Sequence, residues 1–282
     1  MIDTISSQEY EGFCNFLQKS CGISLGENKQ YLITSRLGKI LDNNNLATLE
    51  ELLIILIRDR HSPLIGEVVD AMTTNETFWF RDGHLFESFQ HIVIPELAKN
   101  TTNPIRIWSA ACSTGQEPYS ISMVIDEYLQ GRKNANIDVQ ITATDISVSS
   151  LAIAKAGLFD DRSLHRGISN ERRNKHFTPV EALWEVKPVI KKRIEFKALN
   201  LLNNYAGLGR FDVIFCRNVL IYFSQDAKKN ILTRMATSLK PGGYLFLGSS
   251  ETISGYTDAL EMQWCESGVI YRAKNIPKYQ TL

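Results

Sequence analysis

The sequence predicts an α/β protein in which a doubly wound, Rossmann-like domain follows a small all-α domain. Residues 7–74 carry apolar side chains at three- and four-residue spacings, which is typical of helices. Beyond about residue 86, near-continuous apolar segments alternate with helical segments, and this alternation indicates a parallel sheet covered on both faces. We therefore expect domains at 1–72 and 87–282, joined by a linker at 73–86.

Turn signals divide each domain into elements. In the first domain, Gly, Asn and Ser-Pro signals separate four expected helices, at 7–23, 28–45, 48–60 and 63–74. In the second domain we expect strands at 105–110, 139–145, 193–199, 211–217 and 244–249, with helical segments that include 118–130, 149–157 and 226–240. The chain between 157 and 193 is longer than one connecting helix needs, so an insertion is expected there.

The composition argues against several classes of function. Basic and acidic residues number 31 each, so no global field attracts nucleic acid or a membrane surface. The five cysteines form no C-x-x-C pair and the five histidines no H-x-x-x-H spacing, so we expect neither a metal site nor a disulfide framework. No cationic, apolar leader begins the chain, and no apolar run reaches the roughly 18 residues of a membrane span. We expect a cytoplasmic protein without membrane insertion.

The loop after the first expected strand is the candidate cofactor cradle. In open α/β sheets, ligands bind beyond the carboxyl ends of the strands. Gly115 and small neighbours such as Ala111 suit a close approach of backbone to ligand, but the G-x-G-x-x-G spacing of dinucleotide sites is absent. Glu117 precedes Pro118, a favoured first helical residue, so a carboxylate stands where a phosphate would bind. A cationic ligand fits this loop better.

S-adenosylmethionine (SAM) is such a ligand, with an adenosine, a sulfonium and an amino-acid tail but no phosphate. Glu117 suits its ammonium group, and Asp145, at the end of the second strand, suits its ribose hydroxyls. Two other interpretations remain open: Glu117 as an acid favoured by the helix dipole, and Asp145 as a strand-end cap before Ser147. Arg217 and Asn218 are expected at the same edge of the sheet.

The linker "NETFWFR" is polar and then aromatic. One interpretation is a plain interdomain connection with an aromatic plug. The other is a segment that folds back over the cofactor, so that Asn75, Thr77 and Arg81 face the cofactor.

Taken together, "NETFWFR", "RIWSAACSTGQEPYS", "ITATDIS", "FDVIFCRNVLIYF" and "LKPGGYLFLGSSE" resemble the chemotaxis receptor glutamate methyltransferases, the CheR family, and "GISLGENKQYLITSRL" extends the resemblance weakly into the N-terminal helices. The resemblance implies a Rossmann-like SAM methyltransferase domain that leaves S-adenosylhomocysteine (SAH) as product. One departure is Gly-Gln-Glu-Pro, where the family commonly has Gly-Glu-Glu-Pro; it retains Glu117.

The resemblance also assigns site residues. It places Asn75, Thr77 and Arg81 at the cofactor tail or the transferred methyl, and Glu117 and Asp145 at the amino-acid portion and the ribose. Asn200 and Leu201, in "KALNLL", would lie against the adenine, and Arg217 and Asn218 would close the site. Together with the cradle residues, the expected cofactor set is Asn75, Thr77, Arg81, Ala111, Gly115, Glu117, Asp145, Asn200, Leu201, Arg217 and Asn218, without a metal.

Methyl transfer to a carboxylate needs little acid–base chemistry. A glutamate side chain, with a pKa of about 4.3, is already an anion at neutral pH. Arg81 and Tyr222 are therefore expected to act as donors that orient the substrate carboxylate. The alternatives are a methyltransferase acting on another protein or a small molecule, and a cofactor-sensing adaptor without catalysis; the Asn/Asp-Pro-Pro-aromatic motif of many DNA amino-methylating enzymes is missing.

The resemblance implies the cytoplasmic domains of chemoreceptors as partners. Lys29, Arg36 and Lys39 fall on one arc of an expected helix, where they form either a docking face for receptors or an ordinary solvated face. The insertion is expected to hold an antiparallel β-subdomain at about 171–193, which in some family members binds a pentapeptide at the receptor C-terminus. This segment contains no glycine, and Pro179 and Pro188 remove backbone donors, so we expect no pentapeptide capture.

Overall fold

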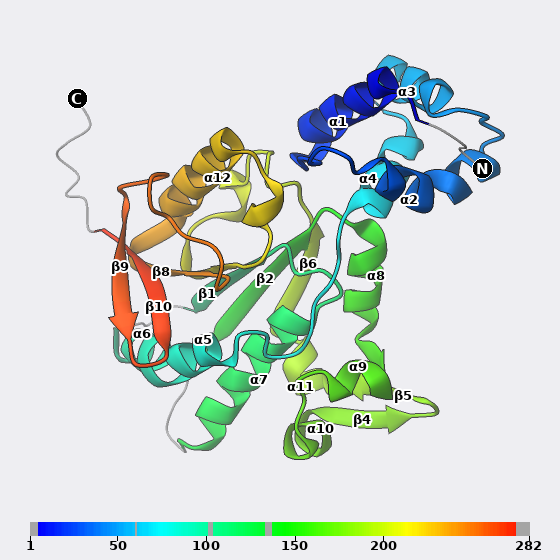
Figure 1. The fold of residues 1–282 in the computed structure, drawn as a ribbon. Coiled ribbons are helices and arrows are strands. Elements are labelled where there is room, and N and C mark those ends of the chain that lie inside the picture. Colours follow the sequence, from blue (N-terminus) through cyan, green and yellow to red (C-terminus); the bar gives the residue numbers. More distant parts are fainter. Residues whose placement is uncertain (1–4, 60, 101–103, 133–136, 275–282) are drawn as a thin grey trace.

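The computed structural model describes residues 5–59, 61–100, 104–132 and 137–274. The outer ends of the two expected domains, at 1–4 and 275–282, and residue 60 of the third expected helix lie outside these ranges. The first part is a helical domain of α1 (Ser7–Cys21), α2 (Gln30–Asn43), α3 (Leu49–Arg58) and α4 (Pro63–Met72) (Figure 1). Ser6 begins α1 with a capping box shared with Glu9, and Gly22 ends it with a φ of 79°. The four predicted helices are confirmed, with a core of their own.

The second part is a seven-stranded sheet in the order β6-β2-β1-β7-β8-β10-β9. Five strands run parallel: β6 (Ile194–Ala198), β2 (Val139–Asp145), β1 (Ile105–Ala110), β7 (Phe211–Cys216) and β8 (Leu239–Leu247). They coincide with the five predicted strands, although β8 begins earlier than expected. The chain passes from β1 to β2 and β6 and then crosses to β7 on the other side, which places the switch in strand order between β1 and β7.

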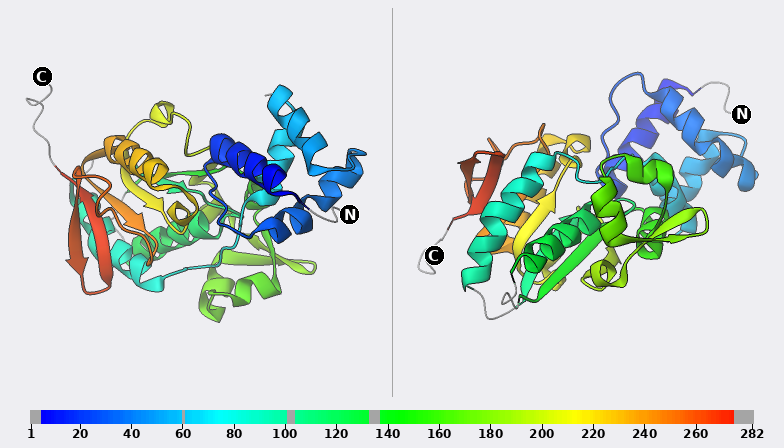
Figure 2. Two further views of the ribbon diagram at one scale, coloured as in Figure 1. Left: turned by 45° about the horizontal axis from the view of Figure 1, so that its top comes forward. Right: turned by 90° about the horizontal axis from the view of Figure 1, so that it is seen from below.

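Helices cover both faces of the sheet (Figure 2). One face packs against α5 (Gly83–Ser88), η1 (Phe89–Val93), α6 (Ile94–Asn100) and α7 (Gln116–Gln130), and the other against α12 (Gln225–Ser238) and the short turns η2 (Ala206–Leu208) and η3 (Leu220–Tyr222). The helix α8 (Val148–Ala156) packs against β2 and β6. The prediction for the start of α7 was wrong, because the helix begins at Gln116 and Pro118 is its third residue, where an N–H has no intrahelical partner.

Two further strands were not predicted. The hairpin of β9 (Leu260–Cys265) and β10 (Gly268–Ala273) adds antiparallel strands to the edge of the sheet beside β8. The hairpin was not predicted because the apolar residues of β9 do not mark a single buried face: Met262 and Trp264 are exposed.

The predicted insertion is present as a small three-stranded antiparallel sheet in the order β3-β5-β4, with β3 at Leu158–Asp160, β5 at Leu183–Val186 and β4 at Phe177–Val180. The helices α9 (Asp161–His165) and α10 (Asn170–His176) pack against β3 and β4, and α11 (Pro188–Lys191) packs against α7. Because β3 belongs to the sheet, the expected range of 171–193 covers only two of its strands. Pro179 lies on the edge strand β4, whereas Pro188 begins α11 and lies outside the small sheet.

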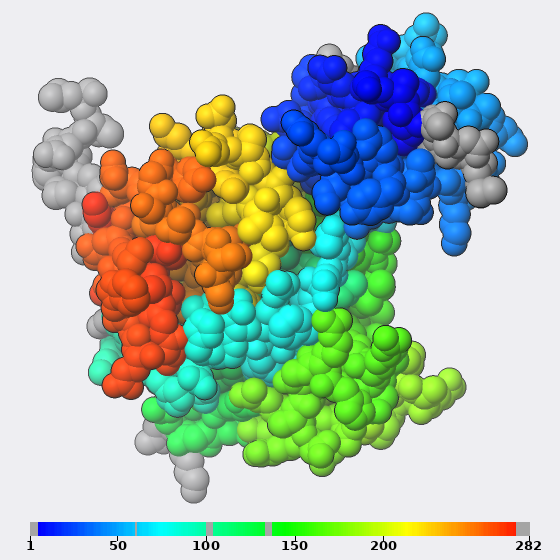
Figure 3. All heavy atoms as spheres, viewed as in Figure 1, coloured from blue at the N-terminus to red at the C-terminus, as the bar shows by residue number. Residues whose placement is uncertain are grey.

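The linker crosses the front of the molecule, from the helical domain to α5 (Figure 3). Its aromatic part is anchored, since Trp79 is buried in contact with the rings of Tyr119, Phe159 and Phe177. Phe80 and Asp82 both adopt left-handed backbone conformations, with φ of 50° and 55°. Non-glycine residues reach this region at a cost, which is often found at functional sites. In the described part of the chain, no helix has the length and apolar character to cross a membrane.

Candidate cofactor site between the two domains

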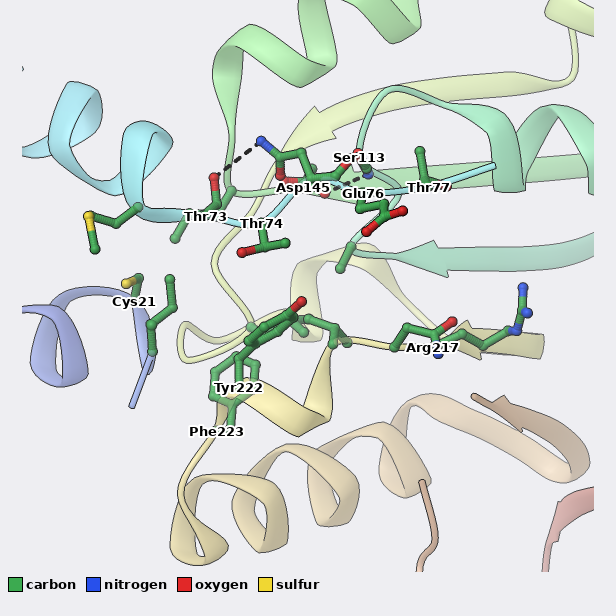
Figure 4. Close-up of a pocket in the computed structure, with 18 of the residues that line it drawn as sticks. Cys21, Thr73, Thr74, Glu76, Thr77, Ser113, Asp145, Arg217, Tyr222 and Phe223 are labelled. Atoms are coloured by element: carbon green, nitrogen blue, oxygen red, sulfur yellow. Dashed lines mark hydrogen bonds between the residues drawn. The ribbon is translucent and has the colours of Figure 1, made fainter. Parts of the chain in front are cut away.

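A cavity of about 290 Å³ lies between the helical domain, the linker and the carboxyl ends of β1, β2 and β7. Its volume is near the lower end of the roughly 300–1,000 Å³ typical of small-molecule pockets. Thr73, Thr74 and Thr77 of the linker lie on one side of it, with Cys21 of the helical domain and Tyr222 on others (Figure 4). Of the predicted residues, the cavity is lined by Asn75, Thr77, Arg81, Ala111, Glu117, Asp145, Asn200, Leu201, Arg217, Asn218 and Tyr222.

Gly115 is the exception, because it does not line the cavity. Its φ is 97°, and a Cβ there would lie 3.0 Å from the Cβ of Ala154 and 3.2 Å from the ring of Tyr119. The glycine is required by the turn into α7 and by packing against α8, and its expected approach to a ligand stays a prediction. Ala111 instead lines the cavity, with a φ of 61°.

Glu117 and Arg217 form an ion pair at the inner end of the cavity. Arg217 Nη1 lies 3.0 Å from Glu117 Oε2, and Ser109 Oγ donates to Glu117 Oε1 at 2.7 Å. Arg217 Nη2 also lies 2.9 Å from Asp82 Oδ2 and donates to the carbonyl of Arg81. Burial raises the pKa of the Glu117 carboxyl, while the charge of Arg217 opposes that rise. Because Arg217 pairs with both Asp82 and Glu117, it only partly neutralises the Glu117 carboxylate, which can still attract a bound cation.

Asp145 combines the two roles that its sequence context left open. Its carboxylate accepts hydrogen bonds from the N–H groups of Ser113, at 2.7 Å, and Ser147, at 2.9 Å, so it does cap the end of β2. It also faces the cavity, where burial raises its pKa in spite of those N–H donors. Since a carboxylate offers about four acceptor sites, ligand hydroxyls can still bond to it. Through the N–H of Ser113, Asp145 holds the loop 111–113 in place. Ser113 also lines the cavity, although it was not among the predicted site residues.

The linker folds back over the cavity, as one of its two interpretations predicted. Asn75 Nδ2 donates to Thr73 Oγ1 at 3.2 Å, and the Asn75 carbonyl accepts from Ser113 Oγ at 2.8 Å. The guanidinium of Arg81 lies 5.4 Å from the centre of the Phe78 ring, and its Nη1 donates to the carbonyl of Glu76. Within the described residues, no carboxylate forms an ion pair with Arg81, so its charge remains available to a ligand.

The helical domain forms part of the wall. Asn200 Nδ2 donates to the carbonyl of Ser20 at 2.7 Å, and the N–H of Ser24 donates to the carbonyl of Tyr222 at 2.9 Å. Gly22 is packed so tightly that a Cβ there would lie 2.4 Å from the ring of Phe223. The sequence did not reveal this contact between the segment after α1 and the loop after β7, since it depends on how the domains pack.

Arg36 has a different role from the expected one. Its Nη1 donates to the carbonyls of Met72, at 2.8 Å, and Thr73, at 3.2 Å, so it fastens the start of the linker to α2. Arg36 and Lys29 both line the cavity. Arg36 therefore supports the cavity wall in addition to lying on the helix face that was predicted to dock receptors.

The cavity residues fit SAM. A carboxylate in the first turn of α7 would repel a phosphate and attract an ammonium or sulfonium group. A second acid stands at the end of β2, and apolar side chains such as Leu201 and Val219 supply a surface for an adenine ring. Among the described residues, no cluster of His, Cys, Asp and Glu is suited to a metal ion.

Comparison with known proteins agrees with this geometry. Residues 8–73 match the family model of the CheR methyltransferase all-alpha domain, and residues 75–269 match that of the CheR methyltransferase SAM binding domain. Chemotaxis protein methyltransferase 1 of Pseudomonas aeruginosa is 52% identical, covering 95% of this chain and 99% of that protein. Chemotaxis protein methyltransferase Cher2 of Pseudomonas putida is 50% identical, covering 94% and 98%.

Chemotaxis protein methyltransferase 1 of Vibrio cholerae is 49% identical, again over nearly the full length of both chains, with 96% and 98% covered. The matched models span the helical domain, the linker and nearly all of the sheet, and therefore include each wall of the cavity. The chain belongs to the CheR methyltransferase family, and its cofactor is SAM.

Proposed function

We propose that the protein transfers the methyl group of SAM to glutamate side chains in the cytoplasmic domains of chemoreceptors, forming glutamate methyl esters. The observation that carries this proposal is the placement of charge in the cavity. Two acids with little exposure, Glu117 and Asp145, suit a cationic cofactor, while Arg81 presents a cation without an ionic partner among the described residues. A carboxylate substrate would be attracted to Arg81, whereas an amine substrate would be repelled.

The protein's contribution to the reaction is binding, orientation and exclusion of water. The cofactor, when bound, supplies a methyl group that its sulfonium already activates. A substrate glutamate is ionised at neutral pH, so no side chain has to remove a proton. Arg81 and Tyr222 would donate hydrogen bonds to its carboxylate and align it, and the walls from the helical domain would exclude water. Arg81 is only half-buried, which limits how far it weakens the nucleophile.

The cofactor roles form part of the same proposal. Glu117 would bind the ammonium group and Asp145 the ribose, while Arg217 orients Glu117. The remaining residues would contact the cofactor's tail, methyl or adenine: Asn75, Thr77, Arg81, Ala111, Asn200, Leu201 and Asn218.

Alkaline lability of the transferred methyl tests the type of bond. After incubation with methyl-labelled SAM and a chemoreceptor cytoplasmic fragment, the label should be released as methanol in mild alkali, because carboxyl esters hydrolyse and N-methyl groups do not. Label that survives alkali would indicate an N-methyltransferase. No incorporation, in a protein that binds SAH, would favour a cofactor-sensing adaptor.

We predict that the β-subdomain does not bind a receptor's C-terminal pentapeptide. The strands β3 and β4 form the edges of the small sheet, and Pro179 on β4 cannot donate a backbone hydrogen bond. The hairpin turn is nevertheless tight without glycine, because Glu181 adopts a φ of 52°, so the absence of glycine does not by itself prevent the turn. Calorimetric titration with a peptide ending in Asn-Trp-Glu-Thr-Phe should give no detectable heat.

The matched control is a receptor fragment with and without its C-terminal tail. Equal methylation rates are expected for both. Micromolar binding of the peptide, or a much slower rate on the tailless receptor, would contradict the prediction.

A further inference from the structure

A carboxylate behind the cavity holds the loop that forms one of its walls. Glu251 follows β8, and its side chain reaches the loop that follows the neighbouring strand β7. Its Oε2 accepts from the N–H groups of Asn218, at 2.7 Å, and Gly248, at 2.8 Å. Its Oε1 accepts from those of Leu220, at 2.8 Å, and Val219, at 3.0 Å. One carboxylate therefore ties the carboxyl ends of two parallel strands together through four backbone donors.

The loop that Glu251 holds has a strained backbone. Asn218 adopts a φ of 56°, in the left-handed region that costs energy for a residue with a side chain. Hydrogen bonds from three successive N–H groups to a charged acceptor offset that cost. The loop supplies five residues that line the cavity: Arg217, Asn218, Val219, Tyr222 and Phe223.

Gly248 shows how closely this cluster is packed. A Cβ at this position would lie 2.7 Å from Asn218 Nδ2 and 2.8 Å from Glu251 Oε2. Any side chain at Gly248 must therefore displace either the carboxylate or the loop. A substitution at Gly248, directly after β8, therefore disturbs the contact between Glu251 and the loop without removing the charge of Glu251.

We propose that Glu251 is a positioning residue for the SAM site: it does not line the cavity, but it sets the conformation of the loop after β7 that does. This inference rests on the assignment of the cavity to SAM and is independent of the methyl acceptor. Binding of SAH by the unmodified protein establishes the site first, so a failure of that assignment is distinguishable from a failure of this inference.

The test is Glu251→Gln. In either orientation, glutamine turns its NH2 group toward one pair of the backbone N–H groups, so that pair loses its acceptor. The Kd of SAH should rise by about ten-fold or more. The KM for SAM should rise in parallel, and any fall in kcat at saturating SAM should be smaller than the rise in KM, since Glu251 itself touches no reacting group. A merely structural defect would reduce the amount of active enzyme and leave KM unchanged.

Asp212→Asn is the matched control at the opposite end of the sheet. Asp212 accepts from the N–H of Arg106 at 2.8 Å and pairs with Lys240 at 2.7 Å, so it also ties strands together. It should lower stability without changing the Kd of SAH by more than about two-fold.

Gly248→Ala is the second test variant and decides the matter if Glu251→Gln does not fold. It should weaken SAH binding in the same direction. A folded Glu251→Gln or Gly248→Ala protein with unchanged SAH affinity would overturn the proposal. Equal weakening by Glu251→Gln and Asp212→Asn would do the same.

Discussion

Replacing Arg217 by methionine is expected to lower the free energy of unfolding by about 3–5 kcal/mol, because it leaves a buried carboxylate without its partner. The side chain of Arg217 is 2% exposed and that of Glu117 is 12% exposed. The loss also frees the linker, since Arg217 contacts both Asp82 and the carbonyl of Arg81. We expect SAH affinity to fall by about 100-fold or more, as the pair supports both the cavity floor and the linker.

The deficit of Arg217→Met should depend on pH. Burial places the folded-state pKa of Glu117 above its unfolded value, so its contribution to stability is greatest below the unfolded pKa and is lost as pH rises through the folded pKa. Without Arg217, the charged form of Glu117 is disfavoured further. The gap in stability between the unmodified protein and the variant should therefore be smaller at about pH 5 than at about pH 8.

Urea unfolding at the two pH values measures this gap. Lys197→Met is the control, since it removes an exposed ion pair with Glu195 and should cost less than about 1 kcal/mol at either pH. Adding Glu117→Gln to Arg217→Met should recover part of the lost stability, because the uncompensated charge is gone. A pH-independent deficit below about 1 kcal/mol would show that the pair contributes little.

Arg81→Gln is expected to lower kcat by about 100- to 1,000-fold and to raise the Kd of SAH by a smaller factor, about ten-fold or less, since Arg81 is proposed to contact the cofactor as well as the substrate. Arg81 is the cavity cation without an ionic partner among the described residues, and the substrate carboxylate needs a donor that sets its approach to the methyl group. Single-turnover rates, together with SAH titration, separate the chemical step from cofactor binding.

Arg166→Gln is the matched control for Arg81. Arg166 also lies over the Phe78 ring, at 5.5 Å, but it pairs with Glu76 and does not line the cavity. Its loss should leave kcat within about two-fold of the unmodified protein. Equal losses at Arg81 and Arg166 would mean that both arginines act through Phe78 and the linker, not through the substrate.

The fold was predictable because its central strands are buried on both faces and stand out as apolar runs. The antiparallel hairpin of β9 and β10 was not predictable in this way, since Met262 and Trp264 are exposed and blur the alternation. Helix boundaries were also less certain: Pro118 pointed to a start at itself, whereas α7 begins at Gln116.

The lining of the cavity was predictable where a side chain stands at the end of a strand, as with Asp145 and Arg217. It was not predictable where a residue acts through the backbone of a distant segment. Glu251 accepts hydrogen bonds from N–H groups about 30 positions earlier in the chain. Asp82, a residue of the linker, contacts Arg217 at the end of β7. The packing of Gly115 was not predictable for a related reason, because it depends on contact with Ala154 of α8 and the ring of Tyr119.

The position of the methyl group on the receptor is the most direct test of the proposed methylation of glutamate side chains. After reaction of a chemoreceptor cytoplasmic fragment with SAM carrying a deuterated methyl group, tandem mass spectrometry of its peptides should find the label on glutamate side chains. The label should be absent when Arg81→Gln replaces the unmodified protein at short reaction times. Label on lysine, arginine or histidine, or on none of the receptor's residues while SAH binds normally, would contradict the assignment of the protein as a glutamate methyltransferase.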